Sequence, residues 1–205
     1  MQDGGDDDLM RRAGLGDRAA FSRLVARHLA RATGVAGRVT GNRSDAEEVV
    51  QEAFLRAWLK APDWEAQADR NAAAGAPGAS FATWFYRVLV NLCIDRKRRP
   101  VTAPIEAADD VADPAPGGFE VTAEAETRRK VATAVEALPE RQRAALVLCH
   151  FEGVSNIDAA AILEITIGAL ESLLVRARRT LKDALQDLAP DRPAFKGRAP
   201  KGFTP

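Results

Sequence analysis

The sequence predicts an all-α protein with two small helical domains joined by a flexible acidic linker. Three observations support this: apolar residues recur at helical spacing, capping residues precede most of these stretches, and strand patterns are nearly absent. A chain of 205 residues suits one or two small domains. We place a four-helix domain at residues 1–99, the linker at 100–122, a helix-turn-helix domain at 123–188 and a disordered tail at 189–205.

The first domain begins with two predicted helices. A short helix runs from about Asp8 to Leu15, and Asp17 is the expected cap of a longer helix that continues towards Val39. The longer helix runs through five residues at helical spacing, which are Phe21, Leu24, Val25, His28 and Leu29.

The third helix is expected from Asp45 to about Lys60, because Ser44 and Glu47 form a capping-box pattern. Its core stripe is Ala46, Val49, Val50, Ala53, Phe54, Ala57 and Trp58. A second line on this helix mixes acids with leucines: Glu48, Glu52, Leu55 and Leu59. A purely solvated face rarely needs leucines, so this line is either a docking surface or a set of incidental exposed leucines.

The fourth helix follows a loop at Ala66 to Ala79 and is expected to be capped by Ser80. Its core positions are Phe81, Trp84, Phe85, Val88, Leu89 and Leu92. The other side carries Thr83, Arg87, Asn91, Asp95 and Arg98, and the helix ends in Arg96-Lys97-Arg98-Arg99. Aromatic rings beside Asn and basic residues suit single-strand binding. Alternatively, the rings are simply core and the bases complement the helix dipole.

The second domain follows a stretch at 101–121 that is rich in Pro, Gly and acids and has no base. Pro139 suits a first helical position, Gly153 ends that helix, and Ser155 and Thr166 are the expected caps of two more. The last helix carries apolar Ile167, Leu170, Leu174, Ala177 and Leu181, with Arg176, Arg178, Arg179 and Lys182 between them. Two short helices with a basic second one form a major-groove reader, or else a hairpin with a solvated basic face.

Charge and residue usage exclude several classes of protein. The net charge is zero, and residues 139–185 hold as many acids as bases, so this module binds DNA weakly unless a larger partner helps. Cys93 and Cys149 are expected to be buried thiols in a reducing cytosol, and neither they nor His28 and His150 have metal-ligand spacing. We expect no cofactor, no metal and no small-molecule substrate.

The start of the chain and its motifs point the same way. Met1 to Asp8 is acidic and lacks the order of a signal peptide, and no apolar run is long enough to span a membrane, so the expected location is cytoplasmic. No phosphate-binding, metalloprotease or nucleophile–base pattern occurs, and acids such as Asp109 and Asp110 lie in the expected linker. An enzyme is therefore the least favoured class.

Taken together, the blocks resemble the bacterial sigma factors of the extracytoplasmic-function group. The segments that carry the resemblance are "DAEEVVQEAFLRAW" at Asp45–Trp58, "SFATWFYRVLVNLCIDRKRR" at Ser80–Arg99, "LPERQRAALVLCHFEGVS" at Leu138–Ser155 and "VRARRTLK" at Val175–Lys182. The likeness spans roughly Asp8 to Leu185 in matching order.

The resemblance implies three surfaces. The third helix is similar to the one that docks on core RNA polymerase, and its candidates are Asp45, Glu48, Gln51, Glu52, Leu55 and Arg56. The fourth helix and the loop before it resemble the part that opens the minus-ten promoter element around a flipped base. Its candidates are Arg70, Asn71, Trp84, Arg87, Asn91, Asp95, Arg96 and Arg98. The second domain resembles the minus-thirty-five reader, with Arg141, Arg143, Glu171, Ser172, Val175, Arg176, Arg178 and Arg179.

The implied partners are core RNA polymerase, promoter DNA and an anti-sigma protein, which in this family is often membrane-anchored. The linker resembles the segment that threads the polymerase interior. Three positions depart from the family: Glu164 stands in a turn that commonly has Gly, and Glu171 and Leu173 stand where many members carry bases. A stand-alone helix-turn-helix regulator is the alternative function, and tight duplex binding by the pure protein would favour it.

Overall fold

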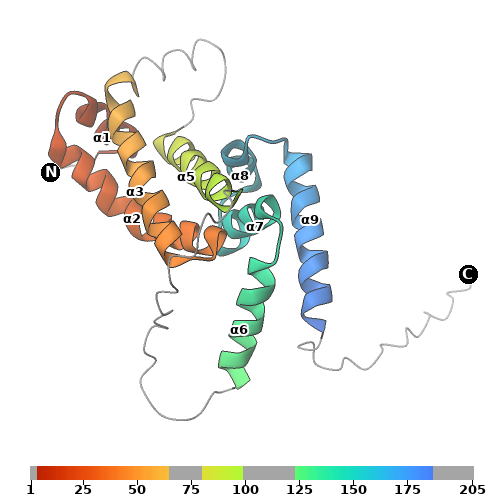
Figure 1. Ribbon diagram of the computed structural model, residues 1–205. Helices are drawn as coiled ribbons and strands as arrows, with labels where there is room; N and C mark the ends of the chain where they lie inside the picture. Colours follow the sequence, from red (N-terminus) through yellow and green to blue (C-terminus); the bar gives the residue numbers. More distant parts are fainter. Residues whose placement is uncertain (1–3, 65–79, 99–122, 187–205) are drawn as a thin grey trace, which may run out of the picture.

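The computed structural model describes residues 4–64, 80–98 and 123–186, and all regular elements in these ranges are helical. The first half holds α1 (Asp6–Gly14), α2 (Arg18–Thr40), α3 (Arg43–Lys60), the short 3-10 turn η1 (Ala61–Asp63) and α5 (Phe81–Arg98). The second half holds α6 (Ala123–Glu136), α7 (Glu140–Leu146), the π-helical turn η2 (Val147–Phe151), α8 (Asn156–Leu163) and α9 (Ile167–Ala184). The all-α prediction is confirmed (Figure 1).

Four of the predicted helix caps are confirmed by side-chain hydrogen bonds. Asp17 accepts from the backbone N–H of Ala20 at 3.0 Å and so begins α2. Ser80, Ser155 and Thr166 each accept from the N–H three residues further on, at the starts of α5, α8 and α9. Such caps satisfy N–H groups that have no partner inside the helix.

Two predicted helix starts are wrong by a small margin. Helix α3 begins at Arg43, and its cap is Asn42, whose side chain accepts from Asp45 N–H at 3.0 Å. Asn is as good a cap as Ser, so Asn42 caps the helix two positions before the predicted Ser44. Pro139 is the N-cap of α7 and not its first helical residue.

In the first half, α2, α3 and α5 pack together around aromatic rings. Phe81 and Phe85 are fully buried, and their rings stack with centroids 5.5 Å apart. Helix α1 closes one end of this core with Leu9 and Met10, which are also fully buried. Leu29, at the end of the apolar spacing on α2, is 46% exposed and lies outside this core.

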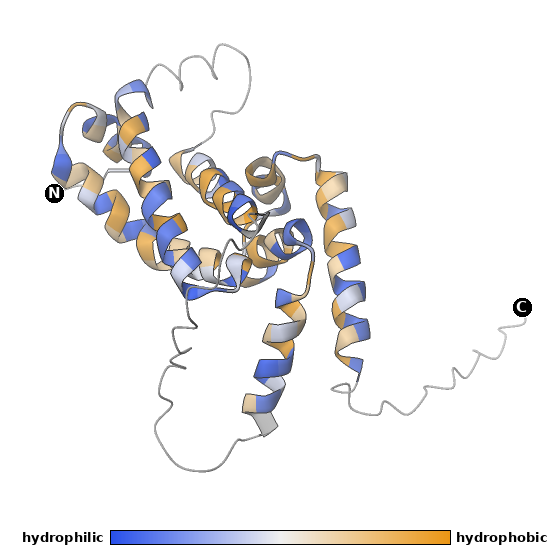
Figure 2. Ribbon diagram, viewed as in Figure 1, coloured by the Kyte–Doolittle hydropathy of each residue, from blue (hydrophilic) through white to orange (hydrophobic). Residues whose placement is uncertain are grey.

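The second half builds its helix-turn-helix from α7, α8 and α9. Leu170, Leu174 and Ala177 are buried along one side of α9, which Figure 2 shows as a stripe of hydrophobic residues. A small second cluster of Val135, Leu138, Leu146 and Ala177 joins α6 and α7 to α9. Ile167, which continues the apolar spacing at the start of α9, is 45% exposed.

The two halves share one hydrophobic core in this structure. Buried residues of α7 and α8, among them Leu148 and Ile162, belong to the same cluster as those of the first helices. Helix α8 packs against α5, as Figure 1 shows. The C-terminal half therefore lies directly on the helix expected to open the minus-ten element.

None of the helices in the described part of the chain combines the length and the apolar character needed to cross a bilayer.

Candidate docking and nucleic-acid interfaces

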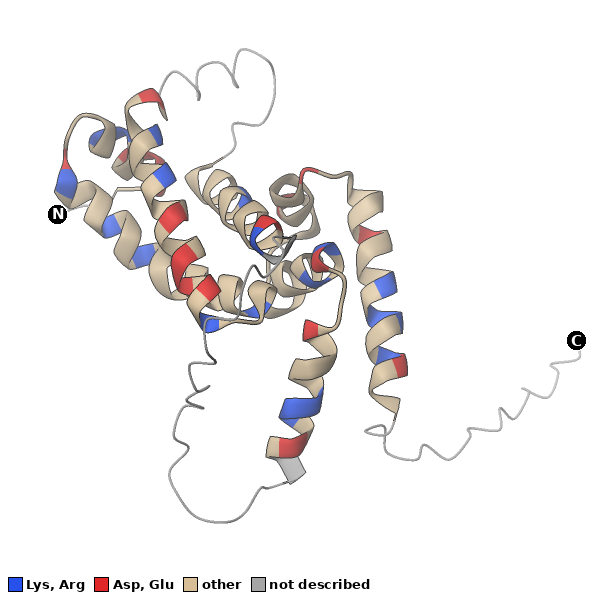
Figure 3. Ribbon diagram, viewed as in Figure 1, with Lys and Arg blue, Asp and Glu red and all other residues tan. Residues whose placement is uncertain are grey.

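One face of α3 carries all six candidates for polymerase docking. At about 100° per residue, they fall within a sector of about 140°, opposite the buried side. Leu55 and Leu59 are 51% and 67% exposed on this face, among acids that Figure 3 shows along α3. An exposed leucine pair flanked by carboxylates is suited to an apolar contact with a basic rim.

The charged groups of this face are already paired within the chain. Arg56 donates to Glu52 at 2.8 Å, one turn apart. Arg96 of α5 reaches across to Asp45 at 2.8 Å and to Glu48 at 2.5 Å. The hydrogen bond to Asp45 and the nearby carboxylates raise the pKa of Arg96.

Arg96 therefore does not share the side of α5 expected to read the minus-ten element. Together with Asp95, it lines an open groove of about 430 Å³ between α3 and α5, whose other walls include Glu48, Glu52 and Arg56. In this structure Arg96 is paired with the carboxylates of α3, and its contact with the minus-ten element stays a prediction. The sequence placed it on the DNA side because it stands in a basic cluster.

The remaining described candidates on α5 do share one face. Trp84, Arg87, Asn91 and Asp95 fall within a sector of about 80° around the helix. Asn91 and Asp95 are exposed, whereas Trp84 and Arg87 are half-buried. The Trp84 ring contacts Trp64 edge to face, with centroids 5.6 Å apart, so its orientation is fixed by the core.

Arg87 is engaged by the C-terminal half. Its guanidinium donates to the Glu164 carboxylate at 3.0 Å, and its side chain is only 28% exposed. Glu164 lies in the turn between α8 and α9 and is the one non-glycine residue with positive φ in the described chain, at φ 54° and ψ 46°. This left-handed conformation is strained for a residue with a Cβ. The residue that replaces the family's usual Gly thus covers a predicted DNA contact.

The basic face of α9 is open by comparison. Glu171, Ser172, Val175, Arg176 and Arg179 are all exposed on the side opposite the buried stripe. Among the described residues, Arg176 and Arg179 have no ion-pair partner, while Arg178 contacts His150 at 3.0 Å. Figure 3 shows the basic residues in succession along α9. Arg141, on α7, is exposed as well.

Arg143 does not fit the expectation that it contacts DNA. Its side chain is 1% exposed, and it donates to the backbone carbonyls of Val39 and Leu138, both at 2.9 Å, and to that of Glu136. Burial lowers the pKa of this guanidinium. Val39 lies in the last turn of α2, where carbonyls lack helical partners. Arg143 thus joins the two halves, and we remove it from the DNA surface.

A second junction, which sequence reasoning missed, centres on Glu152. Its carboxylate, with the side chain 11% exposed, accepts from Arg31 at 3.0 Å and from Arg38 at 3.1 Å, both on α2. The Arg31 guanidinium also donates to the Glu152 backbone carbonyl. We call this set the Glu152 clasp. No local pattern marks it, because the partners are 121 and 114 residues apart.

Several expectations fall outside the described residues. Arg70, Asn71, the linker at 100–122 and the tail at 189–205 are among them, as is the side chain of Arg98.

Burial raises the pKa of Cys93 to about 12 and raises that of Cys149 as well. Among the described residues, no three His, Cys, Asp or Glu side chains converge as metal ligands.

The fold defines a class: a helical protein in two parts, of which the second contains a helix-turn-helix. Residues 24–100 match the sigma-70 region 2 family, and residues 128–181 match sigma-70 region 4. The ECF RNA polymerase sigma factor SigM of Mycobacterium tuberculosis is 34% identical over 179 residues, 86% of this chain and 82% of that protein. The chain therefore belongs to the ECF RNA polymerase sigma factors, which direct transcription initiation.

Other relatives agree with this assignment. The RNA polymerase sigma-H factor of Pseudomonas aeruginosa is 30% identical over 194 residues, covering 89% of this chain and 95% of that protein. Among solved structures, CnrH in complex with the cytosolic domain of CnrY matches with a TM-score of 0.62 and 27% identity, over 90% of this chain and 99% of CnrH.

Proposed function

We propose that this sigma factor docks on core RNA polymerase through the exposed face of α3, reads the minus-ten element with α5 and reads the minus-thirty-five element with α9. The observation that carries the proposal is the pair of exposed leucines, one turn apart among carboxylates on α3, because a clustered apolar surface of this kind is suited to contact with a partner. The remaining docking residues are Asp45, Glu48, Gln51, Glu52 and Arg56.

On DNA, the two helices have different tasks. The Trp84, Arg87, Asn91 and Asp95 face of α5 offers a ring for stacking and polar groups for an unpaired base. The exposed side of α9 enters the major groove, where Arg176 and Arg179 bind phosphate or base edges and Glu171 accepts from a cytosine amino group. No step in this scheme uses a catalytic residue, and the protein works in the cytoplasm.

The structure is a closed arrangement that has to open for promoter reading. The two element names imply a separation of about 25 base pairs, which is about 85 Å at 3.4 Å per base pair. In the closed form, Arg87 on α5 contacts Glu164, three residues before α9 begins. One closed molecule therefore cannot span both elements, and we infer that polymerase binding separates the halves.

A protein inhibitor of the anti-sigma type is also part of the proposal. CnrH was solved with the cytosolic domain of CnrY, so a relative of this fold binds a second protein. Such an inhibitor is expected to cover the α3 face and hold the closed form. Affinity capture from unstressed and stressed cells tests this: recovery of polymerase alone under every condition contradicts it.

Transcription with purified core polymerase and mapped start sites tests the function. Wild-type protein should create new start sites, and Leu55→Asp should abolish them together with core binding while leaving the helical circular dichroism unchanged. Leu15→Asp, a matched control at a leucine 79% exposed outside the docking face, should retain both. A wild-type protein that redirects polymerase nowhere, or an unfolded Leu55→Asp variant, would overturn the proposal.

A further inference from the structure

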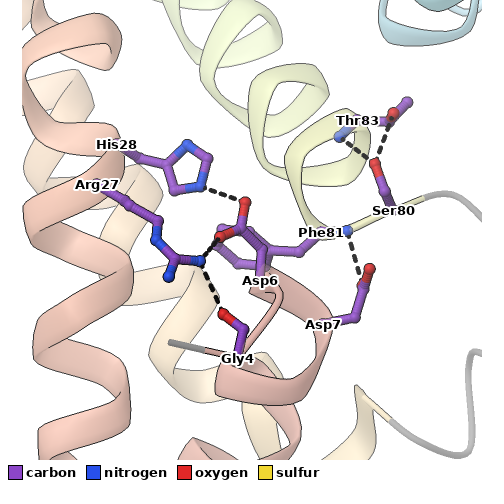
Figure 4. A network of polar contacts seen from close by, with 8 residues as sticks. All are labelled: Gly4, Asp6, Asp7, Arg27, His28, Ser80, Phe81 and Thr83. Carbon is purple, nitrogen blue, oxygen red and sulfur yellow. Dashed lines mark hydrogen bonds and ion pairs between the residues drawn. The ribbon is translucent and has the colours of Figure 1, made fainter. Parts of the chain in front are cut away.

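The N-terminal helix α1 lies before the region that matches the sigma-70 family, which begins at residue 24. It is nevertheless built into the first domain, since Leu9 and Met10 are fully buried against it. Its first turn is unusually acidic, with Asp6, Asp7 and Asp8 in succession. Two of these carboxylates contact α2 and α5, although Asp7 is itself exposed and Asp6 is half-buried (Figure 4).

Asp7 caps a helix that begins 74 residues later in the chain. Its carboxylate accepts a hydrogen bond from the backbone N–H of Phe81, the first residue of α5, at 2.9 Å. The Ser80 hydroxyl accepts a hydrogen bond from the backbone N–H of Thr83 at 3.3 Å, so two side chains hold the first turn of α5. An N–H at this position has no partner within its own helix and is a strong site for a carboxylate.

The neighbouring Asp6 fixes where Asp7 stands. Its two oxygens contact Nε2 of His28 at 2.8 Å and Nη1 of Arg27 at 2.7 Å. Burial works to raise the pKa of Asp6, but the hydrogen bonds from these two side chains prevail and lower it. The His28 ring in turn packs edge to face on Phe81, with centroids 5.4 Å apart. Asp6 thus ties α1 to α2, and Asp7 ties α1 to α5.

We propose that Asp7 is a positioning residue for promoter opening, which fixes the first turn of α5 relative to α2. This inference rests on the proposed role of α5 at the minus-ten element. Trp84 lies one turn after Phe81, so any displacement of that turn moves the ring offered to the unpaired base. Recognition of this kind requires placement within about 0.5 Å, which a frayed helix start does not give.

The test compares variants of Asp7 in reconstituted holoenzyme, with unpaired minus-ten thymines detected by permanganate. Asp7→Ala should lower the opened fraction about tenfold while core binding is unchanged. Asp7→Asn should open nearly as well as wild type, because its amide oxygen still accepts from Phe81. If Asp7→Ala does not fold, Asp7→Ser carries the test, since its shorter side chain falls short of that N–H.

A matched control separates positioning from general stability. Asp17→Ala removes a cap of the same residue type, from α2, and should cost comparable thermal stability with normal promoter opening. Normal opening by Asp7→Ala, equal failure by Asp17→Ala, or failure by Asp7→Asn would each overturn the inference. Asn91→Ala separates this inference from the proposed function. If both Asp7→Ala and Asn91→Ala open promoters normally, the proposed role of α5 is wrong. If Asn91→Ala fails and Asp7→Ala opens normally, only the role of Asp7 is refuted.

Discussion

The two helices proposed to read DNA, α5 and α9, differ in how far the rest of the chain occupies their basic residues. On α5, Arg87 pairs with Glu164 and Arg96 pairs with Asp45 and Glu48. On α9, Arg176 and Arg179 are exposed, with no ion-pair partner in the described chain. The difference shows that the arginines of α9 are open to a partner in this structure, whereas those of α5 are occupied by carboxylates of the same chain.

The paired arginines of α5 reduce the positive charge that this helix offers to DNA in the closed form. Phosphate neutralisation supplies most sequence-independent affinity, and arginines paired with carboxylates of their own chain do not contribute to it. An exposed ion pair adds only about 0.2–1 kcal/mol, so each pairing is weak enough to exchange when polymerase and DNA offer better partners. The comparison can be tested by releasing α5 or disabling α9.

Opening the Glu152 clasp should have the largest effect. Glu152→Arg replaces two attractive contacts with repulsion from Arg31 and Arg38, which favours the open form by about 2 kcal/mol, or about 30-fold. The free variant should bind single-stranded minus-ten DNA more tightly than wild type in fluorescence anisotropy. Glu126→Arg, which makes the same charge change at an intrahelical pair with Lys130, should not. Equal gains in both variants would show that charge alone acts.

Removing a base from α9 should weaken only duplex reading. Arg176→Ala is expected to cost about 1.5 kcal/mol in holoenzyme binding to minus-thirty-five duplex, roughly tenfold, with core binding unchanged. Lys182→Ala, further along the same helix, should cost clearly less. Loss of core binding in Arg176→Ala would refute the assignment of this face to the groove.

Glu164 lies in the turn before α9 and pairs with Arg87 of α5, so it links the two helices that are compared. Glu164→Gln removes the ion pair with Arg87 and keeps the strained left-handed backbone, whereas Glu164→Gly removes both. Glycine adopts positive φ without strain, so Glu164→Gly should be more stable than Glu164→Gln by about 1 kcal/mol in urea unfolding. Both should expose α5 to DNA equally. A glycine variant no more stable than the glutamine variant would mean that this turn stores no strain.

The cysteines give the smallest contrast. Cys93 is fully buried on α5 with its pKa raised to about 12, so iodoacetamide should leave it unmodified in the native protein at pH 8. Cys149, on η2, is only half-buried and should react slowly. Mass spectrometry, with the urea-unfolded chain as the fully reactive control, measures this. Rapid modification of Cys93 would place α5 in an open, mobile state.

Most of the helices could be predicted from local sequence patterns. The residues that were not predicted correctly are those whose partners lie far away in the sequence. Asp17, Ser155 and Thr166 were predictable because a cap acts on an N–H three residues away. Arg143 and Glu152 were not, because the sequence pattern of an arginine or glutamate is the same whether it faces solvent or a distant helix. Asp7 escaped notice for the same reason, since its partner is 74 residues away.

The three surfaces were predictable as faces but not in their membership. Helical spacing placed the α3 and α9 candidates on exposed sides, while the family resemblance supplied their purpose. Arg96 was predicted to contact DNA because of its basic neighbours, and the structure adds that it pairs with Asp45 and Glu48 of α3. Ion pairs between helices determine which surface such a residue belongs to, and the spacing of residues along one helix does not reveal those pairs.

The distance between α2 and α9 tests the central claim most directly. Dyes attached at exposed Ala19 and Thr180, in a chain with Cys149 replaced by Ser, report it by energy transfer in the free protein and in the promoter-bound holoenzyme. Efficient transfer in the free protein, lost once polymerase and promoter are bound, is the predicted result. Transfer that stays equally efficient in a transcribing complex would show that the closed form reads promoters as it stands, and would contradict the account.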